Sequence, residues 1–400
     1  MIKKSSTQAR NAAAMKAGNR LSIISLLMQE PLTRAEIARR SGLTRAAVTI
    51  IVDCLINESV LSEKIVSGKK GATTRLLTVE EQRFLFVGID ITRTGYSVGL
   101  TDLRGQTLDN KEAAIPHDYQ YLIQNIRNEL RRITEYPEWN SRLQGVGLSV
   151  PGPVDHTTGL VINPPHFPLI QGRNILNALK DAVSVPIFIE NNASARALYE
   201  KHAGLGKAYD HFMVMIIDTG IGSGLILNRE LYRGSGYAGE IGHTSINPDG
   251  LPCSCGNRGC LERYAAMPML LADYSTNDEG RPLISWKDMV DQAEAGDTAC
   301  LSAIQSEADY LSKALVNAAN LLDLEAVILT GDIVYKPTIL LKNMQENIQN
   351  ARIARHAHDL CIQVSKPREN AGMASAAMIA TDRFFAGQLD WQEGDQACKS

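Results

Sequence analysis

Three cysteines and one histidine stand close together in the middle of the chain, at His243, Cys253, Cys255 and Cys260. Three thiolates and one imidazole form a complete tetrahedral ligand set for Zn²⁺. Because the protein would supply all four ligands, no position is left for an activated water. We therefore predict one structural zinc ion per chain, the alternative being a loop of three reduced cysteines without metal. The other four cysteines are scattered, which disfavours a disulfide framework.

Contact with a polyanion is indicated by the distribution of charge. Residues 1–83 hold 14 Lys and Arg against 7 Asp and Glu, a net charge of +7, whereas the remainder carries −10. A basic segment joined to an acidic body favours binding of the basic part to nucleic acid, although a solvated basic surface would look the same.

The same segment has the spacing of a helix-turn-helix. Leu21 and Ile24 belong to an apolar face over residues 19–28, and a capping box at 33–36 begins a second helix that runs to about residue 40. Gly42 allows a tight turn, and Thr44 can cap a third helix. The second helix of such a unit enters the major groove of DNA, which would present Thr44, Arg45 and Thr49 to base edges.

A basic hairpin follows the third helix. Residues 60–66 and 75–77 read as two strands around a Gly-Lys-Lys-Gly tip at 68–71, so the module is predicted to be a winged helix. Lys69, Lys70 and Arg75 could contact phosphates or a minor groove. The alternative is a small helical bundle that contacts protein.

The body of the chain repeats one pattern. A strand over 84–90 ends in an aspartate and is followed by return strands over 95–102 and 106–114, a helix over 119–136 and a strand over 145–150. A second strand over 211–218 also ends in an aspartate, and a glycine-rich turn at 219–224 and a return strand follow it. The repetition predicts two related α/β lobes with a cleft suited to a small polar ligand.

Four motifs make the chain resemble a known family. They are Val-Pro-Gly-Pro-Val-Asp at 150–155, Glu-Asn-Asn-Ala at 190–193, Gly-Glu-Ile-Gly-His at 239–243, and the cysteine-rich run at 253–262. With them, residues 85–385 resemble the ROK family of repressors, open reading frames and kinases. The resemblance implies a two-lobed actin-like, ribonuclease-H-like ATPase fold, and zinc on the same four ligands. It also matches the repressor branch, which carries an added amino-terminal winged helix.

The resemblance further implies a sugar site, because a sugar needs convergent, directional hydrogen-bonding groups. Carried over motif by motif, the sugar-binding residues are Gly152, Asn163, Asn191, Asn192, Glu240, His243 and Glu262. His243 would use one ring nitrogen for zinc and the other for a sugar hydroxyl. The alternative is that the glutamates are surface charges and the asparagines are turn residues or caps.

Two departures from the ROK kinases argue against catalysis. Kinases of the family carry an aspartate as general base where this chain has Asn192, and an amide cannot accept the proton of a sugar hydroxyl. After Asp90, Thr92 and Arg93 replace the two glycines of the first phosphate loop, which obstructs the close approach of backbone to nucleotide phosphates. We predict no enzymatic activity and interpret the intact second loop at 219–224 as inherited architecture.

The expected organisation is a winged helix at 1–82, a sugar-sensing body at 83–390 and a polar tail at 391–400. The body would contain lobes of about 83–190 and 191–390, and return of a carboxy-terminal helix to the first lobe is one arrangement that the sequence leaves open. The predicted function is a sugar-responsive regulator, more specifically a repressor of carbohydrate uptake or catabolism genes. It would bind operator DNA as a homodimer or dimer of dimers and leave it on binding the sugar.

Two other functions remain open on the sequence alone. One is an active sugar kinase with a DNA-binding domain, and the other is a regulator that a protein partner displaces from DNA. No apolar run approaches membrane-spanning length and no signal peptide is evident, so we expect a cytoplasmic protein without membrane contact.

Overall fold

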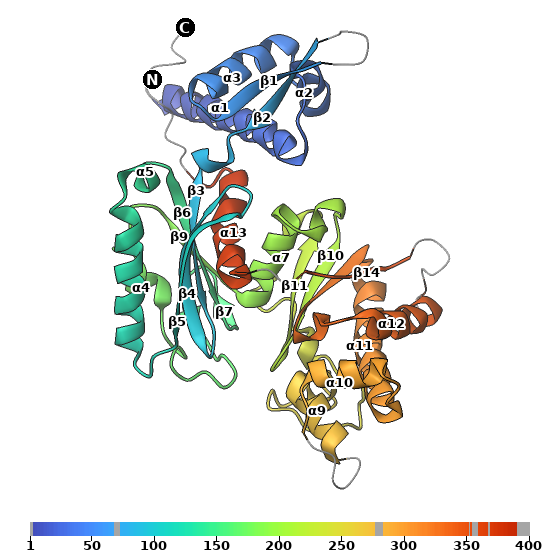
Figure 1. Ribbon diagram of the computed structural model, residues 1–400. Coiled ribbons are helices and arrows are strands. Elements are labelled where there is room, and N and C mark those ends of the chain that lie inside the picture. The colour runs from blue at the N-terminus through green and yellow to red at the C-terminus, as the bar shows by residue number, and fades with distance from the viewer. Residues whose placement is uncertain are drawn as a thin grey trace. The chain divides into compact units, whose positions relative to one another are not determined.

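The computed structural model describes residues 3–67, 73–276, 283–351, 353, 359–366 and 369–389. Its amino-terminal part consists of α1 (Lys3–Gln29), α2 (Arg34–Ser41), α3 (Arg45–Asn57), β1 (Leu61–Ser67) and β2 (Thr73–Val79) (Figure 1). The predicted capping box is present, since Thr33 Oγ1 accepts a hydrogen bond from the Glu36 amide and the Glu36 carboxylate accepts one from the Thr33 amide. Gly42 lies at φ 73° in the turn, and β1 pairs antiparallel with β2. This order is that of a winged helix, as predicted.

The first helix is longer than its apolar pattern indicated. It begins at Lys3 rather than near residue 19. From residue 15 on, where side chains are described, the buried apolar residues of the helix start at Leu21, so the apolar periodicity covers only its last part. The alanines at 12–14 favour helix by intrinsic propensity alone.

The first of two five-stranded sheets has the order β5-β4-β3-β6-β9. Its strands are β3 (Leu85–Ile91), β4 (Gly95–Asp102), β5 (Thr107–Ala114), β6 (Leu143–Val150) and β9 (Ile187–Asn191). Helix α4 (Tyr119–Thr134) lies along one face and α13 (Ala371–Phe385) along the other (Figure 1). Short elements in the same stretch of sequence are η1 (Glu81–Arg83), α5 (Pro137–Asn140), β7 (Val154–Asp155), β8 (Leu160–Val161) and α6 (Ile175–Leu179).

The second sheet repeats the first, with the order β12-β11-β10-β13-β14. Its strands are β10 (Phe212–Ile217), β11 (Ile221–Leu227), β12 (Glu230–Leu231), β13 (Ala326–Gly331) and β14 (Cys361–Val364). In each sheet the earliest strand is central, its two antiparallel successors lie on one side, and two later strands lie on the other. The duplication predicted from the sequence is therefore confirmed.

Helices cover both faces of the second sheet. They are α7 (Asn192–His202), α8 (Glu262–Ala265), α9 (Met267–Thr276), α10 (Trp286–Glu294), α11 (Thr298–Leu322) and α12 (Thr338–Ala351), with single turns η2 (Leu205–Ala208), η3 (Ile241–His243) and η4 (Asp332–Val334). Met213, Met215 and Ile217 alternate along β10 and belong to the core that α10 and α11 complete. Helix α7 packs against β10 and β11 (Figure 1).

The glycine-rich segment at 219–224 is only partly a turn, which corrects the prediction. The turn spans 218–220, and Ile221 already begins β11. A side chain at Gly224 would place its Cβ 2.4 Å from the Ala193 carbonyl oxygen and 2.7 Å from the Ala197 side chain of α7. Gly224 therefore lets β11 approach α7 closely, a role that the prediction of a turn did not include.

Contacts divide the chain into two compact units. One comprises residues 1–148, 176–188 and 377–400, and the other comprises 149–175 and 189–376. The first unit thus groups the winged helix with most of the first sheet. The boundary expected at 82/83 marks a change of architecture within it, so the division into domains remains a proposal. The expected polar tail at 391–400 lies outside the described residues.

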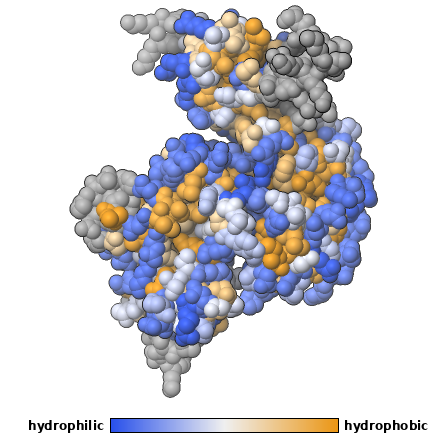
Figure 2. All heavy atoms as spheres, turned by 180° about the vertical axis from the view of Figure 1, so that it is seen from behind, coloured by the Kyte–Doolittle hydropathy of each residue, from blue (hydrophilic) through white to orange (hydrophobic). Residues whose placement is uncertain are grey.

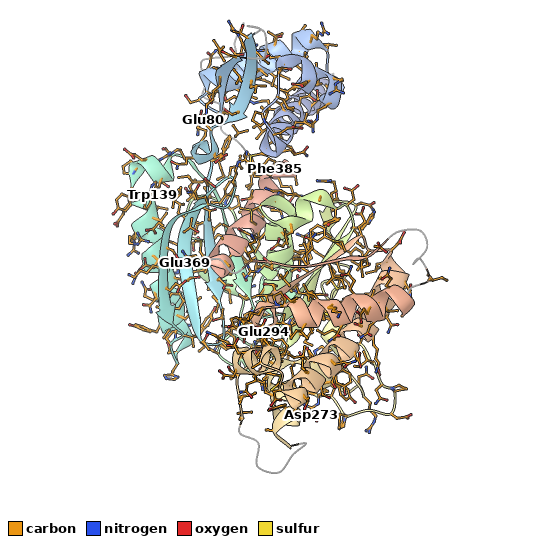
Figure 3. All side chains as sticks on the ribbon, turned by 45° about the vertical axis from the view of Figure 1, so that its right-hand side comes forward. Glu80, Trp139, Asp273, Glu294, Glu369 and Phe385 are labelled. Carbon is orange, nitrogen blue, oxygen red and sulfur yellow. The ribbon has the colours of Figure 1, made fainter. Side chains whose placement is uncertain are left out.

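One apolar cluster joins the winged helix to the sheet inside the first unit. Ile24 and Leu27 of α1 share it with Phe84, Phe86 and Phe384. The Phe84 and Phe384 rings lie 4.8 Å apart. Glu80 and Phe385, labelled in Figure 3, lie on the two segments that meet at this joint. The winged helix is therefore anchored by a core and not by a bare linker.

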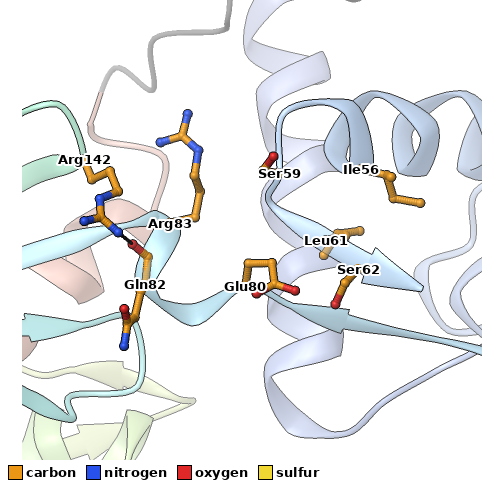
Figure 4. A pocket seen from close by; sticks show the side chains of 8 residues that line it. All are labelled: Ile56, Ser59, Leu61, Ser62, Glu80, Gln82, Arg83 and Arg142. Carbon is orange, nitrogen blue, oxygen red and sulfur yellow. Dashed lines mark hydrogen bonds between the residues drawn. The ribbon is translucent and has the colours of Figure 1, made fainter. Parts of the chain in front are cut away.

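Polar contacts reinforce the same joint. Arg20 and Glu58 form a buried ion pair, Arg83 Nε donates to the Glu58 carbonyl, and Arg104 Nη1 donates to the Met28 carbonyl at 2.8 Å. A cavity of about 470 Å³ lies here, between the hairpin and the segment that follows it (Figure 4). Its lining residues are Ile56, Ser59, Leu61, Ser62, Glu80, Gln82, Arg83 and Arg142.

Hydrophilic residues cover much of the face seen in Figure 2, and the apolar ones gather there in separate patches. Among the described residues, no helix is both long enough and apolar enough to cross a bilayer.

Candidate functional site

The four predicted metal ligands converge. The ligand atoms of His243, Cys253, Cys255 and Cys260 lie within 4.8 Å of one another. The Cys255 and Cys260 sulfurs are 3.6 Å apart, and the Cys253 sulfur is 3.7 Å from His243 Nδ1. In a zinc tetrahedron two sulfurs lie about 3.8 Å apart, and a sulfur and a nitrogen about 3.5 Å. This cluster can hold a metal ion, and its dimensions fit zinc.

A tight loop builds the cluster. The Cys253 amide donates to the Asn257 carbonyl at 2.8 Å, and Gly256 lies at φ 92° in the turn between them. Gly259 lies at φ 66°, where an added Cβ would stand 1.6 Å from the Asn247 carbonyl oxygen. Glycine is therefore required at this position by its conformation and by its packing.

The neighbouring thiols oppose one another's ionisation. Burial raises the pKa of Cys253, but hydrogen bonds from Cys255, His243 and Cys260 outweigh it and lower that pKa to about 7. Burial and the neighbouring thiols raise the pKa of Cys260 to about 12. One thiolate therefore suppresses the next, and a divalent cation would stabilise all three.

His243 links the metal cluster to the predicted sugar residues. Its Nδ1 faces Cys253, which leaves Nε2 for another partner. It ends the single turn η3, and the glycines of its motif hold that turn against β11. An added Cβ would lie 2.2 Å from the Ser223 carbonyl oxygen at Gly239 and 2.2 Å from the Ile221 carbonyl oxygen at Gly242. The Ser223 hydroxyl donates to the Gly239 carbonyl at 2.7 Å.

Two carboxylates accompany this histidine. Glu262 Oε2 accepts a hydrogen bond from the Ile221 amide at 3.0 Å, so one of its oxygens holds the start of β11. Loss of solvent around its carboxyl raises the pKa of Glu240; His243 opposes that rise and the Glu262 carboxylate adds to it. The Glu262 carboxylate therefore disfavours the ionised form of Glu240.

The predicted asparagines both act as local hydrogen-bond acceptors. Asn191 Oδ1 caps α7 by accepting from the Ser194 amide at 2.7 Å, and Asn192 Oδ1 accepts from the Ala193 amide at 3.0 Å. The alternative that an asparagine of this motif acts as a helix cap is therefore correct for Asn191. Each side-chain NH₂ group remains a possible donor to a ligand. An added Cβ on Gly152 would lie 3.0 Å from the Asn191 Cβ, so the first motif packs directly against the second.

The segment that carries Asn163 is held by the last residue of the first motif. Asp155 accepts hydrogen bonds from Thr157 and Thr158, which lower the pKa of its carboxyl well below the ordinary range and close the β7–β8 hairpin. Asn163 is exposed two residues after β8. Among the described residues no hydrogen bond joins it to the other members of the predicted set.

Sequence reasoning missed an ion pair at the base of this site. Arg233 Nε donates to Glu190 Oε1 at 2.6 Å, and the two side chains are 20% and 5% exposed. The amides of Gly236 and Ala238 donate to the Arg233 carbonyl, so Arg233 organises the turn that leads to Glu240. The only signal in the sequence is a charged residue inside the Glu-Asn-Asn-Ala motif, where burial demands a partner.

The two candidate phosphate loops differ. In the first, Thr92 Oγ1 donates to the Gly95 carbonyl at 2.9 Å and accepts from the Gly95 amide at 3.0 Å, so a threonine closes the β3–β4 turn. In the second, Gly220 lies against the Glu262 carboxylate, and Gly224 lies against α7. Both of these glycines have structural reasons that require no nucleotide.

The predicted DNA-contacting residues of the winged helix are largely exposed. Thr44 caps α3, and Arg45 and Thr49 follow on its outward face. Arg75 on β2 is paired with Glu63 at 3.2 Å. Lys69 and Lys70 lie outside the described residues.

Comparison with known proteins identifies relatives over most of the chain. The ROK family model matches residues 86–383. The xylose repressor of Bacillus subtilis is 30% identical, over 92% of this chain and 96% of its own. A glucokinase of Halalkalibacterium halodurans is 27% identical over 74% of this chain and 94% of its own. A solved ROK family transcriptional regulator, a homologue of the Escherichia coli Mlc protein, has the same fold, with a TM-score of 0.79, 24% identity, and coverage of 94% of this chain and 98% of that one.

Proposed function

The chain belongs to the ROK family, and we propose that it is a sugar-responsive transcriptional repressor of carbohydrate uptake or catabolism genes. The observation that carries the proposal is the union of a winged helix with a ROK body whose general-base position holds Asn192. The similarity to a xylose repressor over 92% of the chain supports it. Such a protein would act in the cytoplasm.

The sugar site of this proposal is the set Gly152, Asn163, Asn191, Asn192, Glu240, His243 and Glu262. These residues all belong to one compact unit. Glu240 and Glu262 would accept hydrogen bonds from hydroxyls, and the asparagine NH₂ groups would donate to sugar oxygens. His243 would hold zinc through Nδ1 and present Nε2 to the sugar, since metal ligation fixes the tautomer. Zinc would have a structural role, because four protein ligands complete its shell.

The absence of catalysis is part of the proposal. The oxygen of Asn192 already accepts from the Ala193 amide, and the first loop is closed by Thr92. Neither the Asn192 amide nor the Thr92 turn supplies a group that could accept the proton of a sugar hydroxyl. The relation to a glucokinase favours the rival reading, an active kinase with a DNA-binding module. Measurement of ATP consumption over a panel of sugars distinguishes a repressor without catalysis from an active kinase. Sustained turnover would contradict the hypothesis of a repressor without catalysis.

Operator binding is assigned to Thr44, Arg45, Thr49, Lys69, Lys70 and Arg75. Arg45, on the first turn of α3, would read bases, and the basic residues of the hairpin would contact phosphate. A single winged helix reads few base pairs, so a homodimer or dimer of dimers on a two-fold symmetric site is expected.

The experiment is selection of duplexes from a random library, followed by binding titrations with and without candidate sugars. We expect a two-fold symmetric site that one sugar releases. Thermal unfolding with the same sugars is the companion measurement, because a ligand of the native state raises its stability. If no sugar stabilises the protein or releases DNA, the sugar-effector part is wrong and control by a protein partner is favoured.

A further inference from the structure

The outward face of α3 carries two parallel strips of residues. Arg45, Thr49 and Asp53 follow one another at helical spacing and are exposed. Beside them Ala46 and Ile50 form a second, apolar strip that is also exposed. Polar and apolar side chains therefore lie side by side on the face of α3 that would contact DNA under the proposed function.

Ile50 is unusual among the large apolar residues of this helix. Its side chain is 65% exposed, whereas Val48, Val52 and Leu55 are completely buried. Its burial would add nothing to the core, because the core face of α3 is already complete. An exposed isoleucine alone is ordinary, so its neighbours decide what it can bind.

The charges around Ile50 favour a polyanion. Asp53 is paired with Arg34 at 2.7 Å, and Glu63 of β1 is paired with Arg75 at 3.2 Å. Both acids are therefore neutralised. Arg45 forms no ion pair with any residue that the structure describes, so its charge remains available on the same face. One unpaired arginine beside an apolar strip is complementary to a DNA major groove and less so to an apolar protein surface.

Hydrogen bonding further limits what this face can read. The Thr49 hydroxyl donates to the Arg45 carbonyl at 2.9 Å, so its proton is used inside the helix. Ala46 and Ile50 offer only methyl and methylene groups. In the major groove the one apolar feature of a base pair is the C5-methyl group of thymine.

We infer that Ile50, supported by Ala46, reads thymine methyl groups in the operator. The inference rests on the proposed DNA-binding function and adds a base identity to it. Each half-site should contain a thymine one or two base pairs from the position that Arg45 contacts, since Ile50 lies about one and a half turns further along α3.

The test uses operators selected by the native protein, in which each thymine is replaced in turn by deoxyuridine. This change removes one methyl group and leaves every hydrogen bond in place. We expect about a fourfold loss of affinity at the thymine that Ile50 contacts, the ratio that corresponds to one buried methylene-sized group. With Ile50→Ala the two operators should bind equally at that position, and Ile50→Val should retain part of the difference.

The matched control is Ile65→Ala, because Ile65 lies on β1 with a similar exposure of 67%. It should keep the native pattern of thymine preferences. Thermal unfolding of Ile50→Ala should match that of the native protein, since the side chain lies outside the core.

Three outcomes would overturn the inference. The native protein could tolerate deoxyuridine everywhere, or Ile50→Ala could keep the native thymine pattern. Ile50→Ala could also lower the mass of the oligomer while thymine preference persists, which would assign the strip to a second copy of the chain. If the native protein selects no duplex at all, the proposed function fails first, and that failure is distinct from the other three.

Discussion

The two sheets share one strand order but differ in what their first hairpin does. In the first, the β3–β4 turn is closed by Thr92, whose hydroxyl donates to the Gly95 carbonyl and accepts from the Gly95 amide. In the second, the β10–β11 hairpin is tied to Glu262, to the Gly239–His243 motif and through it to the metal cluster. Both sheets therefore have the same strand order, whereas the residues of the candidate ligand site all belong to the second compact unit. Predictions can break or sharpen this contrast.

The largest expected effect is on the metal cluster. Cys255→Ser should lower the zinc content below about one ion per chain and should weaken sugar binding about ten- to a hundredfold, because His243 belongs to both sites. Cys255 is exposed, so the substitution removes little packing. Metal analysis and calorimetric titration measure the two effects, and Cys361→Ser on β14 is the control. Zinc loss with unchanged sugar affinity would show that the two sites are independent.

The Glu190–Arg233 pair should matter almost as much. Arg233→Met removes the ion-pair partner that Arg233 supplies to the buried Glu190 carboxylate, which should cost about 3–5 kcal/mol of unfolding free energy. Arg229→Met is the matched control, since its pair with Asp210 at 2.7 Å is 52% and 58% exposed and should be worth less than about 1 kcal/mol. Denaturant unfolding compares them, and equal losses would mean that burial of the Glu190 pair has no special role.

Much of the fold and of the metal cluster was predictable from the sequence, because the residues that signal them lie close together along the chain. The capping box and the Gly42 turn are each signalled within a few residues, and the metal ligands lie within residues 243–260. The Glu190–Arg233 pair was not predictable, because it joins residues 43 positions apart through tertiary packing. The start of β11 inside the glycine-rich segment was missed for a similar reason, since Gly224 is explained only by α7. The exposure of Ile50 depends on which face of α3 the rest of the module covers.

The next prediction concerns the core of the second unit. Glu307 of α11 is fully buried, and neither carboxyl oxygen has a hydrogen-bond partner among the described residues. Burial raises its pKa well above the ordinary value. The unfolded chain therefore releases this proton near pH 4.5 while the folded chain retains it. The contribution of the protonated Glu307 carboxyl to the free energy of unfolding is complete below about pH 4.5, and it is lost as the pH rises toward the pKa in the folded state.

Glu307→Gln should remove this dependence. Between pH 5 and pH 8 the native protein should lose stability relative to the variant by up to about 1.4 kcal/mol per pH unit until the folded-state pKa is reached. Denaturant unfolding of both proteins at several pH values measures the difference. Parallel pH profiles would show that Glu307 is not buried as an uncharged acid.

The smallest effect tests the first hairpin. Thr92→Ala removes two hydrogen bonds to Gly95 in an exposed turn, which should cost about 1 kcal/mol of stability. Sugar affinity should not change, because the proposed site uses no residue of this turn. A loss of sugar binding in this variant would mean that the β3–β4 turn takes part in ligand recognition.

The central claim is that occupancy of the second unit's site controls DNA binding, and one measurement tests it most directly. Operator affinity is titrated with and without the cognate sugar for the native protein and for Glu240→Ala. The account predicts that sugar releases the native protein from DNA, whereas the variant binds DNA normally and ignores the sugar. Release of the variant at the same sugar concentration would place the effector site elsewhere and contradict the account.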